Sequence, residues 1–166
     1  MTRTFEDIEA EAVSLIEALD ASAHSQGDTG ARWRETSIPF SVAEDASSLG
    51  HLLFEVWIQD APNSTLSRAG EINEQAATIA ARLRVLFTYR VRSSQQIRDR
   101  RSATGAAHDI VRALMQPWNY DTNGCVDLLL VNALRVDMTA DGEWLLVSQD
   151  YIVEFDLDTS APVVES

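Results

Sequence analysis

The strongest constraint on how this chain folds is the alternation of apolar and polar side chains in residues 81–92. Side chains of a β-strand point alternately to opposite faces, so such a segment forms a strand with one buried and one exposed face. The apolar positions are Leu83, Val85, Phe87, Tyr89 and Val91, and the polar ones are Arg82, Arg84, Thr88, Arg90 and Arg92. The sequence therefore predicts a strand with a row of arginines on its exposed face.

Four other segments have strand patterns. The last two are separated by Asp141 and Gly142, a pair that favours a tight hairpin turn. Pro39 cannot donate a backbone hydrogen bond, so the segment that contains it is at most an edge strand or an extended arm. The four segments are residues 31–40, 51–60, 125–137 and 144–157.

Two further segments, residues 5–19 and 95–115, have the three- and four-residue apolar spacing of amphipathic helices. Thr4 and Asp7 form a capping pattern at the start of the first helix, and Pro117 is expected to end the second. The element order is then α–β–β–β–α–β–β. We predict an α+β fold in which two helices pack on a mostly antiparallel sheet.

A chain of 166 residues is long enough for one hydrophobic core and short for two, so residues 1–166 are predicted to form a single domain. Residues 61–75 lack periodicity and are expected to form a long loop, and residues 159–166 are expected to form a frayed tail. The expected core consists of Leu52, Phe54, Val56, Ile58, Leu83, Val85, Phe87, Ile110, Leu114, Val153 and Phe155.

The chain is strongly acidic: 26 acidic residues against 13 basic ones, all of them arginine, give a formal net charge of -13. A surface of this sign repels nucleic acids and anionic membranes, which disfavours a general DNA-binding function. The apolar runs are too short to cross a membrane, and the acidic N-terminal segment lacks the pattern of a signal peptide. The lone Cys125 excludes an intrachain disulfide and is expected to be a small buried side chain.

The sequence contains no residue pattern that points to catalysis, a cofactor or a metal. His24, His51 and His108 lack the spacing of metal ligands, and the glycines form no phosphate-binding loop. Three alternate acids near the chain's last strand are interpreted as its solvent face rather than as a cation site: Glu154, Asp156 and Asp158. We therefore predict no catalytic, cofactor-binding or metal-binding residue, and no enzymatic function.

The arginines are concentrated in one part of the chain. Residues 82–112 hold eight arginines and two acidic residues, a local net charge of +6, and the remainder carries -19. An unrelieved row of like charges on a strand favours an acidic neighbour, which another copy of the chain could supply. We predict that a subunit interface contains Arg82, Arg84, Arg90, Arg92, Arg98, Arg100 and Arg101.

Two segments stand out beside the element order: RLRVLFTYRVRSSQQ at residues 82–96 and WLLVSQDYIVEFDLD at residues 144–158. With that order they resemble the tail terminator (tail completion) proteins of long-tailed bacteriophages, as a pattern that covers about residues 5–157. Related head-to-tail connector proteins of the phage neck share similar lengths and element orders. The long loop at residues 61–75 and the basic block at residues 82–112 depart from the family's pattern.

The resemblance implies a structural virion protein of the tail or neck that forms a hexameric ring at the end of the tail tube after assembly in the host cytoplasm. Its implied partners are the tail tube protein and the head-to-tail connector protein, and DNA passes through the lumen without specific binding. An acidic lumen would suit that passage. Two other classes stay open: an acidic inhibitor or immunity-type protein that binds a basic partner, and an α+β domain that binds a small molecule.

Overall fold

The computed structural model describes residues 3–40, 49–61, 76–119 and 126–158. Within these residues the elements follow the predicted order, with a short 3-10 helix added after the first helix, and the predicted α+β fold is confirmed. In chain order they are α1 (Phe5–Glu17), η1 (Ser22–His24), β1 (Arg34–Glu35), β2 (Leu53–Asp60), β3 (Ala76–Arg90), α2 (Gln96–Asn119), β4 (Val126–Met138) and β5 (Trp144–Asp158).

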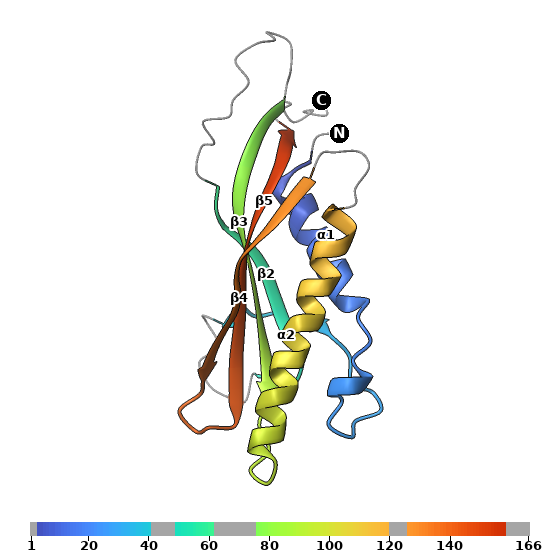
Figure 1. Ribbon diagram of the computed structural model, residues 1–166, viewed down its shortest axis with the longest axis vertical. Coiled ribbons are helices and arrows are strands. Elements are labelled where there is room, and N and C mark those ends of the chain that lie inside the picture. Colours follow the sequence, from blue (N-terminus) through green and yellow to red (C-terminus); the bar gives the residue numbers. More distant parts are fainter. Residues whose placement is uncertain (1–2, 41–48, 62–75, 120–125, 159–166) are drawn as a thin grey trace, which may run out of the picture.

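The strands form one sheet in the order β1-β2-β3-β5-β4. β1 runs parallel to β2, and the other neighbouring strands are antiparallel. β3 and β5 pair over their whole length, from Ala76 opposite Asp158 to Arg90 opposite Trp144. β4 therefore lies at one edge of the sheet, and β1 with β2 lies at the other (Figure 1).

Both helices cover the same face of the sheet (Figure 1). α2 packs mainly against β4, and also against β5 and β3, while α1 packs against β1, β2 and α2. The alternating pattern of the strands places their apolar side chains under these helices. In the described part of the chain no helix covers the opposite face. We call it the open face, and it carries side chains such as Trp57 on β2, Arg84 on β3 and Asp150 on β5.

The predicted core is confirmed: every expected core residue is buried except Ile58, which is partly buried. Two large buried side chains were not predicted, Trp33 and Trp118, which are 2% and 1% exposed. The Trp33 ring packs edge-on against Phe54 and Phe87, with centroid distances of 6.4 and 5.3 Å. The segment that contains Trp33 is thus anchored by an aromatic cluster rather than by a long strand.

The predicted start of the first helix is confirmed, but α1 ends at Glu17 rather than at residue 19, and the predicted end of the second helix is wrong. α1 begins after Thr4, whose side chain accepts a hydrogen bond from the Asp7 amide at 3.1 Å while Asp7 accepts one from the Thr4 amide at 2.7 Å. α2 continues past Pro117 to Asn119. Proline removes one backbone donor, and the burial of Trp118 in the same turn offsets that loss.

The predicted strand boundaries also shift. Of residues 31–40, only Arg34 and Glu35 form a strand. β3 begins at Ala76, earlier than residue 81, because the long β5 supplies a pairing partner for each added residue. The predicted tail, Cys125 and all of the predicted loop except its first residue lie outside the described residues.

Candidate assembly surface

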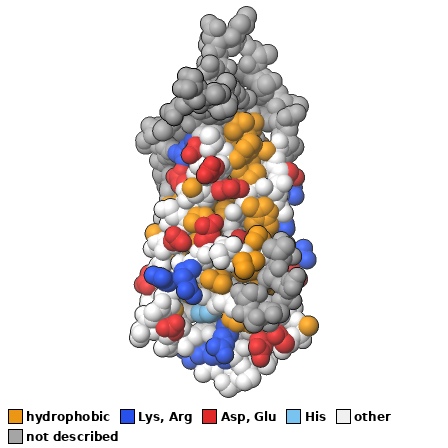
Figure 2. Space-filling view, turned by 180° about the vertical axis from the view of Figure 1, so that it is seen from behind, with side chains coloured by type: hydrophobic (Ala, Val, Ile, Leu, Met, Phe, Trp, Pro, Cys, Tyr) orange, Lys and Arg blue, Asp and Glu red, His pale blue; other side chains and the backbone are white. Residues whose placement is uncertain are grey.

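Hydrophobic side chains form a lengthwise band on the open face, with acidic side chains gathered beside it (Figure 2). At the β4 edge Leu129 is 62% exposed, and Val131, also on β4, is 52% exposed. The sheet register places Leu129 beside Ile152 and Ile152 beside Arg82. Because soluble proteins rarely expose large contiguous hydrophobic patches unless they bind a partner, this face is a candidate contact surface.

A cleft of about 890 Å³ lies on the open face, between the segment after β1 and the strands. Its apolar walls include Phe40, Trp57, Leu86 and Leu146, and the charged side chains that line it are Glu35, Glu55, Arg84, Arg135 and Asp137. A volume of this size with a few charged groups among apolar ones is typical of sites that hold a ligand or a partner's side chains.

Two charged groups of this cleft are held in different ways. Burial raises the pKa of the Glu55 carboxyl, although a hydrogen bond from the Phe40 amide at 3.1 Å opposes the shift. Arg84 lies opposite Asp150 in the sheet and donates two hydrogen bonds to its carboxylate, at 2.7 and 3.1 Å, which raise the pKa of the guanidinium. Arg84 is therefore neutralised within its own chain.

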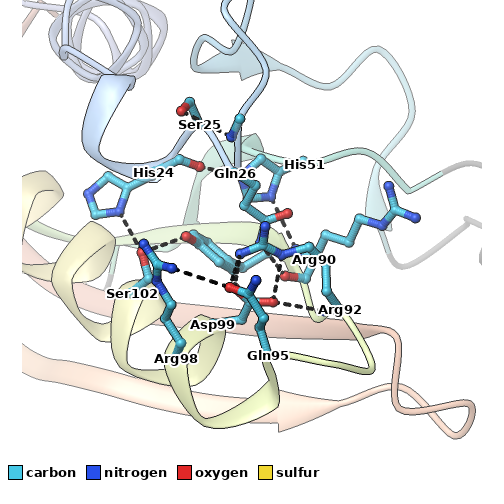
Figure 3. A network of polar contacts seen from close by, with 12 residues as sticks. His24, Ser25, Gln26, His51, Arg90, Arg92, Gln95, Arg98, Asp99 and Ser102 are labelled. Atoms are coloured by element: carbon cyan, nitrogen blue, oxygen red, sulfur yellow. Dashed lines mark hydrogen bonds and ion pairs between the residues drawn. The ribbon is translucent and has the colours of Figure 1, made fainter.

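Arg92 is also neutralised within its own chain (Figure 3). Its guanidinium donates to both carboxylate oxygens of Asp99, at 2.7 and 3.1 Å, and its backbone amide donates to the same carboxylate at 2.8 Å. Asp99 is 1% exposed. Burial alone would raise the pKa of this carboxyl, but the hydrogen bonds from Arg92 outweigh it, and the pKa is lowered. The pair fixes the turn between β3 and α2.

Three arginines at the start of α2 have no carboxylate partner among the described residues. Arg98 donates to the side-chain oxygen of Gln95 at 3.4 Å, and the Arg100 guanidinium lies 3.9 Å from the Met138 sulfur. Arg101 is exposed. These cations are therefore available to a carboxylate of another molecule.

Arg82 and Arg90 complete the predicted interface set, and both are exposed on β3. The structure thus distributes the seven arginines over three places: β3, the turn after it, and the first turns of α2. The sequence pattern could not identify the paired arginines, because the pairing of Arg84 depends on which residue of β5 lies opposite it and the pairing of Arg92 depends on the turn into α2.

A buried histidine joins the segment before β1 to α2 (Figure 3). His24 is 5% exposed, and its ring nitrogens lie 2.8 Å from an Asp109 carboxylate oxygen and 3.2 Å from the Ser102 hydroxyl. The Tyr89 hydroxyl donates to the same Ser102 oxygen at 2.7 Å. We interpret this cluster as a structural link between η1, β3 and α2. No spacing in the sequence signals it, since its members lie on three separate elements.

The other histidines occupy different environments. The His51 ring nitrogens lie 2.6 Å from the His24 carbonyl oxygen and 3.2 Å from the Arg90 amide, and burial lowers the pKa of this ring. His108 is exposed on α2. Among the described residues, no group of three or more His, Cys, Asp or Glu side chains is placed to hold a metal ion. Asp156 instead accepts a hydrogen bond from the Thr78 hydroxyl at 2.6 Å.

Comparison with known proteins finds no matching family model and no significantly similar curated protein. Neither helix in the part of the chain that the structure describes has the length and apolar character needed to cross a membrane.

Proposed function

We propose that this chain is a structural subunit of a phage virion, which forms a ring at the end of the tail tube, terminates the tube and joins it to the head connector. The observation that carries the proposal is the open face with its exposed apolar side chains. A surface of this kind supports stable contact with other proteins. The particular assembly is inferred from the resemblance to tail terminator proteins, in the element order and in the segments at residues 82–96 and 144–158.

The edge strand β4 supports an assembly function in a second way. Five of its apolar side chains are exposed, from 62% for Leu129 to 41% for Leu134 and Met138. The pairing of β4 with β5 is irregular between Leu130 and Asn132 and between Asn132 and Arg135. Such bulges bend an edge strand and discourage the open-ended addition of further strands. We therefore expect β4 to meet its partner through side chains.

The charge distribution supports a ring. A closed ring requires heterologous contacts, in which one patch of a subunit meets a different patch of the next. Residues 82–112 carry a net charge of +6 and the remainder -19, and although Arg84 and Arg92 are neutralised within the chain, the exposed arginines at the start of α2 supply a basic patch on an otherwise acidic molecule. The overall net charge of -13 also suits a lumen that DNA passes without binding.

The oligomeric state of the purified full chain tests the proposal. Native mass spectrometry and electron microscopy should show a ring of six copies, and the ring should bind to the ends of purified tail tubes. A chain that stays monomeric at tens of micromolar and binds tightly to a basic protein would contradict the proposal and favour an acidic inhibitor.

The cleft on the open face favours a second candidate function, the binding of a small molecule. Its volume of about 890 Å³ falls in the range of ligand sites, and Glu55 with its raised pKa lies in the wall. A screen of small molecules by thermal denaturation tests this candidate, because a ligand of the folded state raises the melting temperature. A ligand of the cleft should lose its effect in Trp57→Ala and keep it in His108→Ala.

A further inference from the structure

We infer that the surface formed by the first turns of α2 and the end of β4 binds the α1 side of a second copy of this chain. We call it the α2–β4 surface and define it by Ile97, Arg98, Arg100, Arg101, Val136 and Met138. The inference rests on the proposed ring and names the two patches that close it.

The α2–β4 surface combines exposed apolar side chains with cations that have no carboxylate partner in the part of the chain that the structure describes. Ile97 is 70% exposed, and Val136 and Met138 are 43% and 41% exposed. Val136 and Met138 line a cleft of about 290 Å³ together with Arg100 and Leu145. Apolar groups flanked by arginines are typical of the energetically important part of a protein interface.

The positive charge of this surface is not balanced on α2 itself. The two acidic residues of the helix are both used within the subunit: Asp99 binds Arg92, and Asp109 binds His24. The three arginines in the first turns also lie near the positive end of the helix dipole, where cations are disfavoured. An acidic partner would relieve both effects. The arrangement therefore favours the binding of carboxylates here.

The α1 side of the molecule has the complementary character. α1 carries five acidic residues and no basic one. A cleft of about 410 Å³ between α1 and the edge of the sheet is lined by Glu6, Glu9, Glu17 and Glu35, with Val13 and Val56 as apolar groups. Arginines and an apolar side chain such as Ile97 match this lining in charge and in polarity.

The sheet order places the two patches at opposite edges of the subunit. α2 packs over β4, and α1 packs over β1 and β2, which form the other edge. A contact from one edge to the other is heterologous and propagates from copy to copy until the ring closes. A symmetric dimer would instead bring two like-charged patches together, which the charges oppose.

Duplex DNA is the other polyanion that this surface could bind. Protein is favoured as the partner, because the exposed Ile97, Val136 and Met138 have no role in contacting phosphates and the chain as a whole carries -13.

Charge reversal on the full-length chain tests the inference. One variant, Arg98→Glu with Arg101→Glu, makes both patches acidic. A second, Glu6→Arg with Glu17→Arg and Glu35→Arg, leaves Glu9 as the last acidic side chain of the α1 cleft and makes both patches basic. Each alone should migrate as the 18.4 kDa monomer under conditions in which the wild type forms the ring. An equimolar mixture of the two variants should form the ring again, because each acidic patch then meets a basic one. All variants are first checked for unchanged circular dichroism.

A matched variant, Arg82→Glu with Arg90→Glu, changes the charge equally at two exposed arginines of β3 and should keep the ring. If Arg98→Glu with Arg101→Glu keeps the ring and the β3 variant loses it, the contact lies on the open face and the inference is wrong while the proposed ring stands. If the variants do not complement each other on mixing, the pairing of these two patches is wrong. A wild type that forms no oligomer contradicts the proposed function itself.

Two further results are decisive. If Arg98→Glu with Arg101→Glu folds poorly, the milder variant Arg98→Gln with Arg101→Gln must still weaken the ring. Normal ring formation by this Gln variant would overturn the inference. Retardation of duplex DNA by the wild type at physiological salt, lost in Arg98→Gln with Arg101→Gln while rings persist, would assign the surface to nucleic acid instead.

Discussion

The buried carboxylate of Asp99 is the residue whose charge contributes most clearly to the fold. Asp99→Asn leaves the Arg92 guanidinium without its counter-charge and should lower the free energy of unfolding by about 2–3 kcal/mol, measured by urea denaturation at neutral pH. The exposed pair of Arg135 and Asp137 provides a control, since Asp137→Asn should cost at most about 1 kcal/mol. Equal losses in the two variants would contradict this assignment.

The same residue predicts a pH dependence. The pKa of Asp99 is lowered from 3.8 in the folded protein, so its negative charge stabilises the fold fully at a pH above the pKa of the unfolded chain. This contribution is lost as the pH falls through the pKa of the folded protein. The difference in stability between the wild type and Asp99→Asn should therefore be constant at neutral pH and shrink in acid below about pH 4. Urea titrations at several pH values measure it. A difference that grows in acid would contradict the assigned sign.

We expect substitution of His24 to lower the stability of the fold, because this side chain has a structural role. His24→Ala removes hydrogen bonds to Asp109 and Ser102 and leaves a cavity beneath η1, so we expect a loss of about 2–3 kcal/mol in the free energy of unfolding. His108→Ala, at an exposed position of α2, should change it by less than about 0.5 kcal/mol. Similar stability of both variants would show that the cluster does not hold η1 in place.

The elements of the fold could be predicted where a repeating pattern runs over many residues. The alternation in β3 and the spacing in both helices identified these elements. Phe87 is fully buried and the adjacent Leu86 is only half-buried, as the alternation predicts, but Thr88, predicted on the exposed face, is also buried because its hydroxyl donates to the Gly50 carbonyl oxygen. The short β1, by contrast, depends on contacts that the local sequence does not encode. Trp33 is buried because β2 and β3 place Phe54 and Phe87 beside it.

The candidate site was less predictable than the fold. The arginines were identified by composition, but the partners of Arg84 and Arg92 follow from the sheet register and from a turn. The alternation identified the face that the helices cover, but the cleft on the open face depends on how the segment after β1 lies against the strands, which the alternation does not determine.

Neighbouring side chains of β3 lie on opposite faces of the sheet, so substitutions at adjacent positions should lower the free energy of unfolding by very different amounts. Phe87→Ala should lower the free energy of unfolding by about 3–5 kcal/mol, because a large ring leaves a cavity between the sheet and the aromatic cluster. Leu86→Ala on the open face should cost much less, about 1 kcal/mol, since its side chain stays partly exposed to solvent. Thermal melts of both variants measure this, and a larger loss for Leu86→Ala would reverse the assignment of the faces.

At the scale of the whole molecule, we expect the exposed apolar residues to contribute to association with other proteins and little to the stability of the fold. Leu129→Ser with Val131→Ser should leave the free energy of unfolding within about 1 kcal/mol of the wild type and weaken the association of the ring with purified tail tubes, measured by co-sedimentation. Leu128→Ser changes the adjacent side chain, which is 3% exposed, and should unfold at a clearly lower temperature. Unchanged association in the double variant would remove Leu129 and Val131 from the contact.

The full-length pairing of β3 with β5 also constrains the order in which the elements form during folding. The hairpin of β4 and β5 joins neighbouring segments and can form early, whereas β3 reaches β5 only after α2 and β4 have been accommodated between them. Ordering so long a stretch of chain before the central pairing forms is an entropic barrier, and it places this protein among slow folders of high contact order. Until β3 docks, the hairpin exposes the edge of β5 as well as the outer edge of β4. During synthesis, the bulges of β4 then limit aggregation from one side only.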